Sequence, residues 1–216
     1  MEIRTVSIAD RVFSEIEEKI LCGAYKIGEH LTEMRLSEEY GVSRTPIREA
    51  IRRLEQENLV ESRGKGVTVL GVSRSDLEDI YEVRMRIEGL AAKRAAEKIT
   101  PDELSKLEEA LELQEFYTER KTPDKIRNAD SSFHDIIYTA CRSETLTSIL
   151  KTLHKKTQMY RKISVESTER AEMATKEHRD ILGAIKNKDG ARAEKLAILH
   201  IENARKNITE KLFGVN

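Results

Sequence analysis

The chain has 216 residues, of which 38% are hydrophobic, 36% are charged and only 5% are aromatic. This composition favours helices, and the length suffices for one large domain or two small ones, each with a core. Cys22 and Cys141 show no C-x-x-C spacing, which argues against a disulfide framework or a zinc knuckle. No apolar run approaches the ~18 residues of a membrane span, and the N-terminus lacks a signal-peptide pattern. We therefore expect a cytoplasmic protein that does not cross a membrane.

The charge balance gives no support to nucleic-acid binding. The net charge is −1, and residues 1–72 hold 11 Lys and Arg against 13 Asp and Glu. A basic domain is the usual footprint of a DNA-binding protein. Any contact with DNA must therefore depend on a local cluster of cations, which the sequence offers between Arg44 and Lys65.

The first 72 residues show a recognisable order of elements. Apolar spacing predicts a helix over 7–22, a short helix over 33–40 that begins after Thr32, and a third helix over about 44–57. Ser43 is the expected N-cap of the third helix, which carries a proline in its first turn. Residues 59–62 and 67–70 read as two strands around the turn 63–66. This order is that of a winged helix-turn-helix.

From Ser73 onward the strand signals vanish and six helices are expected. They cover about 75–98, 101–119, 123–141, 144–163, 167–187 and 189–212. Thr100-Pro101 and Thr122-Pro123 each combine an N-cap with a proline in the first helical position. Because the connections are short, neighbouring helices should be antiparallel. We predict a mostly α protein, with a winged helix-turn-helix over 1–72 and an all-α antiparallel bundle over 73–216.

The third helix carries side chains suited to reading DNA. In a helix-turn-helix, this helix enters the major groove with its N-terminal residues toward the base edges. Here these residues are Ser43, Arg44, Thr45 and Arg48. The two arginines are four residues apart and share a face, and a guanidinium can fork onto O6 and N7 of guanine. Thr45 suits a phosphate or a thymine methyl group.

Two further regions could contact the DNA backbone. Arg35 lies in the second helix at a typical phosphate position, and the hairpin tip contains Arg63, Gly64 and Lys65. Glycines at such a tip allow a turn to press close to a groove. The alternative is that the arginines form a solvated helix face and that the tip is only a tight turn.

Four polar residues lie on apolar faces of the later helices and suggest a metal site. Asp130 and His134 are spaced i, i+4, while His178 and His200 lie on the apolar stripes of two other helices. Burying them unpaired would cost several kcal/mol, and a divalent metal would satisfy all four. These donors suit Zn, Ni, Mn or Fe, with Zn or Ni favoured. The alternative is three hydrogen-bonded core histidines.

The two remaining histidines are not candidates for the metal site. His154 lies in a lysine-rich stretch, and His30 lies between two predicted helices. We expect His154 to be at the surface and His30 to be in a loop.

The segment from Leu36 to Val60 resembles the DNA-binding signature of the GntR regulators. The stretch Ser-Arg-Thr-Pro-Ile-Arg-Glu-Ala, from Ser43 to Ala50, is especially characteristic. The resemblance implies a homodimer on a pseudo-palindromic operator, since two-fold protein symmetry is mirrored in the DNA. It also implies operator contacts at Arg35, Arg44, Thr45, Arg48, Arg63 and Gly64.

Residues 75–212 resemble the ligand-binding domain of the FadR-type branch of these regulators, the FCD class. The resemblance is carried by Arg84 and Glu88, the spacing of Asp130 and His134, the Glu-His-Arg of 177–179, and the late His200. It implies a metal held by Asp130 and the three histidines, with positions open to water or a carboxylate effector.

The same resemblance implies residues that meet the effector. It places Arg84 at the effector's carboxylate, a role that a forked guanidinium suits, although a salt bridge with an acid of the bundle is equally open. Arg161, Tyr160 and Asn203 are weaker candidates for the pocket.

Three functions compete on these grounds. The leading hypothesis is a transcription regulator, with repression the expected sense, that senses a small organic acid through a metal-containing helical pocket. The second is a metal-dependent hydrolase, for which Glu177 is the obvious nearby base. The third gives the metal a purely structural role in a DNA-binding protein. We do not expect the protein to be an enzyme.

Overall fold

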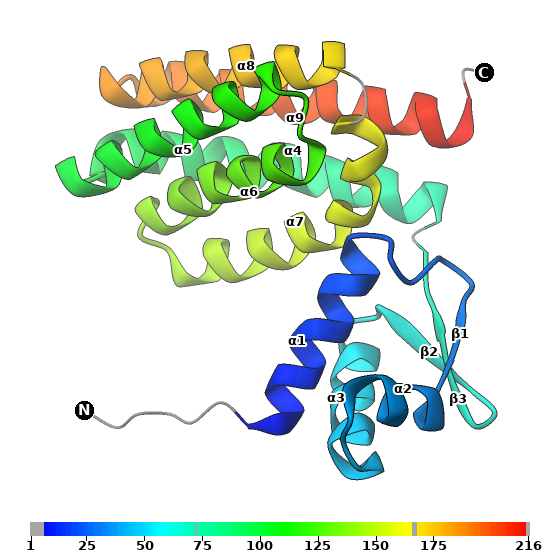
Figure 1. Cartoon of the computed structure of the whole chain (residues 1–216). Helices are drawn as coiled ribbons and strands as arrows, with labels where there is room; N and C mark the ends of the chain where they lie inside the picture. Colours follow the sequence, from blue (N-terminus) through cyan, green and yellow to red (C-terminus); the bar gives the residue numbers. More distant parts are fainter. Residues whose placement is uncertain (1–6, 72, 166–167, 215–216) are drawn as a thin grey trace, which may run out of the picture. The chain divides into compact units, whose positions relative to one another are not determined.

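The computed structural model describes residues 7–71, 73–165 and 168–214, without the side chains of 158–159, 161–165 and 168. The chain divides into two compact units, Met1–Val72 and Ser73–Asn216. Each unit has its own architecture (Figure 1). The prediction of a mostly helical protein is confirmed.

The N-terminal unit is the predicted winged helix-turn-helix. Buried apolar residues of α1, α2 and α3, such as Ile16, Leu36 and Ile47, form its core. A three-stranded antiparallel sheet in the order β1-β3-β2 adds the wing. The elements are α1 (Ile8–Leu21), β1 (His30–Thr32), α2 (Glu33–Tyr40), α3 (Arg44–Gln56), β2 (Val60–Arg63) and β3 (Gly66–Val69).

Strand β1 was not predicted, and its pairing with the wing explains why position 66 is a glycine. β1 pairs with β3, with Leu31 opposite Val67 and Thr32 opposite Gly66. A Cβ atom on Gly66 would overlap the backbone carbonyl oxygen of Leu31. The glycine therefore lets β1 approach the wing, and His30 lies exposed in a strand rather than in a loop. Because α2 begins directly after β1, this pairing also fixes the start of α2 relative to the wing.

The caps of the two short helices differ. The hydroxyl oxygen of Thr32 accepts a hydrogen bond from the N–H of Arg35 at 3.2 Å, and Gly41 ends α2 in the left-handed conformation with φ of 63°. Ser43 occupies the N-cap of α3, but its side chain makes no capping hydrogen bond. The exposed hydroxyl of Ser43 is thus not needed by the helix.

The C-terminal unit consists of helices in the part of the chain that the structure describes. They are α4 (Arg74–Lys98), α5 (Pro101–Glu119), α6 (Pro123–Ala140), α7 (Glu144–Val165), α8 (Thr168–Lys186) and α9 (Gly190–Phe213). Thr100 and Glu103 form a reciprocal capping box at the start of α5. Thr122 precedes α6 without a capping bond, since its hydroxyl donates to the carbonyl of Tyr117 at 3.3 Å.

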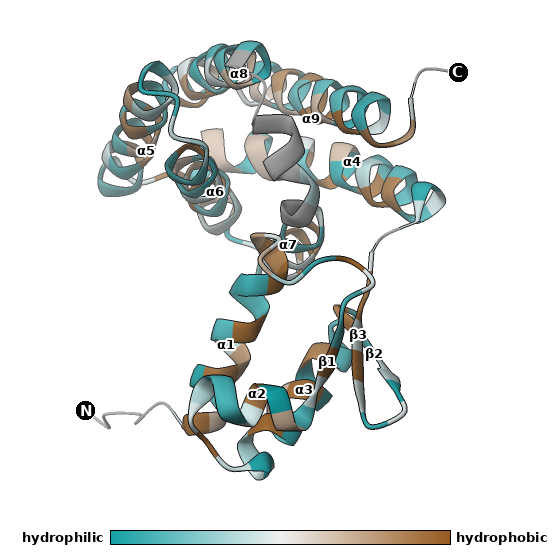
Figure 2. Cartoon of the chain, turned by 45° about the vertical axis from the view of Figure 1, so that its right-hand side comes forward, coloured by the Kyte–Doolittle hydropathy of each residue, from teal (hydrophilic) through white to brown (hydrophobic). Residues whose placement is uncertain are grey.

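Small residues bring the helices of this unit close together. α4 packs against α6, α8 and α9, and alanines such as Ala92, Ala95 and Ala193 lie fully buried in the core that these helices share. A Cβ atom on Gly89 would crowd the side chain of Ile198 on α9. Hydrophobic and hydrophilic residues alternate along these helices (Figure 2). The close packing lets side chains from three helices meet at one point.

Among the described residues, no helix combines the length and apolar character that crossing a membrane requires.

Candidate metal centre and DNA-binding surface

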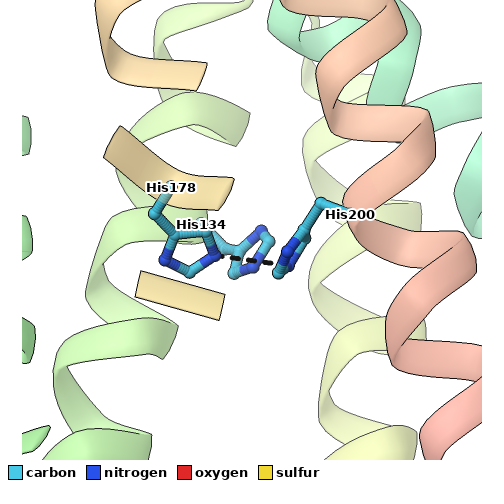
Figure 3. A group of neighbouring side chains, drawn as sticks. All are labelled: His134, His178 and His200. Atoms are coloured by element: carbon cyan, nitrogen blue, oxygen red, sulfur yellow. Dashed lines mark hydrogen bonds between the residues drawn. The ribbon is translucent and has the colours of Figure 1, made fainter. Parts of the chain in front are cut away.

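Three buried histidines of the C-terminal unit converge on one point. His134 comes from α6, His178 from α8 and His200 from α9, and their rings point toward one another (Figure 3). One nitrogen of each ring lies within 4.8 Å of those of the other two. The Nε2 atoms of His178 and His200 are 3.2 Å apart. The predicted convergence of these three residues is confirmed.

The outer nitrogen of each ring is held by an oxygen acceptor. A carboxylate or an amide carbonyl oxygen can only accept, so each Nδ1 carries a proton, and in the neutral ring Nε2 is then left with a lone pair. The three contacts are His178 Nδ1 to Gln114 Oε1 at 2.7 Å, His200 Nδ1 to Glu177 Oε2 at 2.6 Å, and His134 Nδ1 to Glu88 Oε2 at 3.3 Å.

This arrangement fits a cation. Lone pairs that face one another at hydrogen-bond distance repel unless a positive charge lies between them, and Nε2 of His134 has no hydrogen-bond partner among the described residues. Histidines that ligate metals commonly donate their other N–H to a carboxylate or carbonyl. The residues present therefore suit a divalent metal held by imidazole nitrogens.

Asp130 lies beside this cluster. It is buried on α6, one turn before His134, and its Oδ1 is 3.9 Å from Nε2 of His178. The structure thus brings all four predicted metal ligands together, with the carboxylate at the edge of the three imidazoles.

Glu177 links the cluster to an arginine. Besides His200, it accepts two hydrogen bonds from Arg170 at 2.9 and 3.0 Å and one from Asn203 at 2.8 Å. Burial alone would raise the pKa of Glu177, but the bonds from His200 and Arg170 lower it to about 2. Burial also lowers the pKa of His200, in spite of Glu177. Glu177 is therefore a charged acceptor occupied by these donors, which leaves it unsuited to the hydrolytic role considered from the sequence.

Glu88 connects Arg84 to His134. Its Oε1 accepts from Arg84 Nε at 2.6 Å, while its Oε2 faces His134. Burial would raise the pKa of Glu88, but the guanidinium and the imidazole hold it well below its usual range. Arg84 also donates from Nη1 to Thr157 at 2.9 Å, whereas its Nη2 has no hydrogen-bond partner in the described part of the chain. Arg84 thus forms the salt bridge that the sequence left open as an alternative, and it still keeps one buried donor.

A small cavity borders His200 of the cluster. Its volume is about 30 Å³, and its lining includes Gln114, Asp130, Arg170 and His200. A space of this size holds about two water molecules. Arg170, which the sequence analysis did not single out, lines this cavity, whereas Arg84 is not among the described lining residues.

The other candidates for effector binding lie in three different settings. Asn203 reaches the site through Glu177. Tyr160 is buried on α7. The side chain of Arg161 lies outside the described residues.

His154 was wrongly expected at the surface. It is buried on α7, its Nδ1 lies 3.2 Å from the hydroxyl of Tyr138, and its ring centroid is 5.1 Å from that of His134. The neighbouring lysines suggested exposure, but His154 lies on the helix face that also buries Leu150 and Thr157.

The N-terminal unit presents its candidate DNA-reading residues on one exposed surface. Ser43, Arg44, Thr45 and Arg48 are exposed, while Ile47 between them is buried. An open groove of about 510 Å³ is lined by residues from β1, α2, α3 and the wing tip, namely Thr32, Glu33, Met34, Arg44, Arg48 and Lys65. The structure thus brings Lys65 of the turn to Arg44 and Arg48 of α3.

Several of these cations are paired with carboxylates on the surface. Exposed ion pairs of this kind add little stability and can exchange their partner for a phosphate. The pairs are Arg48 with Glu33 at 2.9 Å, Arg35 with Glu29 at 2.8 Å and Arg63 with Glu61 at 3.2 Å. Gly64, between Arg63 and Lys65, has a positive φ of 61°, which a tight turn requires.

Comparisons with known proteins agree with both units. The model of bacterial regulatory proteins of the gntR family matches residues 8–70, and that of the FCD domain matches residues 79–203. The uncharacterized HTH-type transcriptional regulator YdhC of Bacillus subtilis (strain 168) is 28% identical over 193 residues, covering 88% of this chain and 86% of its own. The HTH-type transcriptional repressor RspR of Escherichia coli (strain K12) is 27% identical over 184 residues, covering 85% and 81%.

A solved structure shares the fold. The structure of E. coli McbR/YncC has a TM-score of 0.85 and 24% sequence identity, and the match covers 95% of this chain and 99% of that one. The chain therefore belongs to the gntR family of bacterial regulatory proteins and is a transcriptional regulator rather than an enzyme; its FCD domain after the helix-turn-helix fits the FadR-like subfamily.

Proposed function

We propose that this chain is a cytoplasmic, homodimeric repressor that binds a pseudo-palindromic operator and senses a small carboxylate through a divalent metal. Asp130, His134, His178 and His200 would hold the metal. The observation that carries the proposal is the convergence of one nitrogen from each of three imidazole rings, each of which is held through Nδ1 by an oxygen acceptor.

A metal explains this cluster better than a shared proton does. A proton between His178 and His200 would satisfy their 3.2 Å contact but would leave Nε2 of His134 without a partner among the described residues. Three imidazoles and one carboxylate suit Zn, Ni, Mn or Fe, and we favour Zn or Ni. When bound, the metal would act as a Lewis acid that attracts a carboxylate oxygen.

Two arginines could recognise the rest of the effector. The buried Nη2 of Arg84 lacks a partner in the described part of the chain, and such a donor favours an anionic ligand. Arg170 borders the cavity beside His200. Because the cavity of about 30 Å³ is smaller than an organic acid of several carbons, the ligand would favour a wider arrangement of helices. Such unequal binding to two arrangements is what effector control of DNA affinity requires.

DNA recognition would follow the exposed surface of the N-terminal unit. Arg44 and Arg48 would contact base edges, supported by Ser43 and Thr45. Arg35, Arg63 and Lys65 would contact phosphates, and Gly64 would let the turn approach the groove. Neither Arg44 nor Lys65 forms an ion pair within the described residues, so both are available to an anionic partner.

Metal analysis and DNA binding test the two halves of this proposal separately. Protein purified without chelator should contain metal stoichiometric with the chain, and His178→Ala should lose it while the exposed His30→Ala keeps it. An electrophoretic shift on the intergenic DNA upstream of the gene, repeated with a panel of small carboxylates, should show loss of binding with one of them. Equal metal content in His178→Ala and the wild type would contradict the assigned site.

A purely structural metal is the competing function. It would be favoured if chelation unfolds the C-terminal unit and no carboxylate of the panel changes DNA binding.

A further inference from the structure

We propose that Glu33 is a positioning residue for base recognition, which holds Arg48 so that its terminal nitrogens face a guanine in the major groove. This inference rests on the base-reading role proposed above for Arg48. It assigns to an acidic residue a part in recognising a polyanion.

The contact with Glu33 uses Nε of Arg48 and leaves the terminal nitrogens of the guanidinium for another partner. Nε of Arg48 donates to both carboxylate oxygens of Glu33, each at 2.9 Å. The Nη1 and Nη2 groups carry the remaining four N–H donors, and guanine offers two acceptors, O6 and N7. Arg48 is thus prepared for an end-on, two-bond contact with guanine through Nη1 and Nη2.

The side chain of Glu33 is less exposed than that of Arg48, as expected of a residue that supports the arginine. The side chain of Glu33 is 28% exposed and that of Arg48 is 64% exposed, so the carboxylate lies deeper than the guanidinium. Both line the open groove that also contains Arg44 and Lys65. Arg48 therefore extends from its support toward the space that DNA would fill.

The backbone directly before Glu33 is held by a helix cap and by strand pairing. It is the first residue of α2, directly after Thr32, whose hydroxyl caps the helix and whose backbone pairs with Gly66 of the wing. A carboxylate in the first helical turn is also favoured by the helix dipole. A long arginine side chain fixed on such a support loses less conformational freedom when it binds.

The charge of Glu33 also favours contact of Arg48 with a base over contact with a phosphate. A carboxylate beside Arg48 repels a phosphate and reduces the net charge offered to the DNA backbone. It does not oppose a neutral guanine edge in the same way. The pair therefore lowers the affinity for DNA of any sequence and raises the selectivity for one base. This agrees with the slightly acidic composition of residues 1–72, which hold 11 Lys and Arg and 13 Asp and Glu.

Selection of binding sites from a pool of random double-stranded DNA tests the inference. The full-length wild type is compared with Glu33→Gln, Arg48→Ala, the double variant, and Glu38→Gln. The last removes the same charge from an exposed position on α2. We expect Arg48→Ala to remove the preference for guanine at one position of each half-site. Glu33→Gln should reduce the same preference by about fivefold or more and should bind random DNA at least as tightly as the wild type.

The double variant separates positioning from direct contact. If Glu33 acts through Arg48, the double variant selects the same sites as Arg48→Ala alone, and Glu38→Gln selects the wild-type sites. Loss of preference at a second position would mean that Glu33 reads a base itself and would overturn the inference. An unchanged guanine preference in Glu33→Gln, with Arg48→Ala altered, would also overturn it. If Arg48→Ala itself selects wild-type sites, the proposed readout by Arg48 fails, and the inference fails with it.

Discussion

The two units place their charged groups in opposite environments. In the N-terminal unit, Arg48 is 64% exposed and pairs with a partly exposed carboxylate on the surface. In the C-terminal unit, Arg84 and Glu88 are 1% and 4% exposed and form part of a connected set of polar contacts that reaches His134. The Arg48–Glu33 pair is displayed on the surface, whereas the Arg84–Glu88 pair is buried.

This difference determines what each charge can do. An exposed pair can exchange its partner for DNA at small cost, so it serves binding. A buried pair that loses one member leaves a charge in a medium that cannot solvate it. Substitutions of buried charges in the bundle should therefore change stability and metal affinity, whereas substitutions of exposed charges on the N-terminal surface should change only DNA binding.

The largest effect is expected from Glu88→Ala. The substitution leaves the guanidinium of Arg84 buried without its carboxylate, which should lower the free energy of unfolding by about 3–5 kcal/mol. Urea unfolding in the presence of a chelator measures this effect apart from any metal. The control is Glu82→Ala on the same helix, which removes an exposed i, i+4 pair with Arg86 and should cost at most about 1 kcal/mol. Equal effects of the two variants would contradict the contrast between buried and exposed ion pairs.

Metal removal should have the next largest effect. A ligand present at a hundred times its dissociation constant stabilises the folded state by about 2.7 kcal/mol, so a chelator should lower the melting temperature and added Zn or Ni should restore it. His178→Ala should melt at one temperature with or without the chelator, because it lacks a ligand at the centre. A shift of equal size in His178→Ala would locate the metal elsewhere.

Local signals made much of the fold predictable. The predicted helices 33–40 and 101–119 agree with α2 and α5 at both ends, because Thr32, Gly41, Thr100 and Pro101 act on their immediate neighbours. β1 was missed because three residues show no alternation of their own. The strand exists only through its pairing with β3, some 35 residues later in the chain.

The site was predictable only in part, for a related reason. The histidines that converge could be found from their places on apolar stripes, but the acceptors that orient them depend on how helices pack. Gln114 lies on the stripe of Leu107, Leu111 and Thr118, and a polar residue on an apolar stripe was the signal that found the histidines. Applied to amides as well, the same rule would have identified it. The burial of His154 was missed because exposure was inferred from the neighbouring lysines rather than from the helix face on which His154 lies.

Gln114→Leu should weaken metal binding without removing a ligand. Its Oε1 holds the Nδ1–H of His178 at 2.7 Å, and loss of a partner that orients a metal-ligating histidine reduces metal affinity by about 10–100-fold. Competition with a chelator of known affinity measures the change, and the exposed Glu112→Gln on the same helix serves as the control. The ring of Phe133 is stacked on that of His178, with their centroids 4.2 Å apart. Unchanged metal affinity would mean that this packing suffices to hold the imidazole.

The smallest effect is expected from Lys65→Ala on the N-terminal surface. If Lys65 contacts a phosphate, its removal should weaken binding to all DNA sequences alike and reduce the slope of log K against log salt by about 1. The selected sites should not change, and neither should the melting temperature, because Lys65 is exposed at the wing tip. Lys195→Ala, an exposed cation on α9, should leave the salt slope unaltered. If Lys65→Ala changes the selected sites, the wing reads bases, and the division between positioning cations at the tip and reading arginines on α3 is wrong.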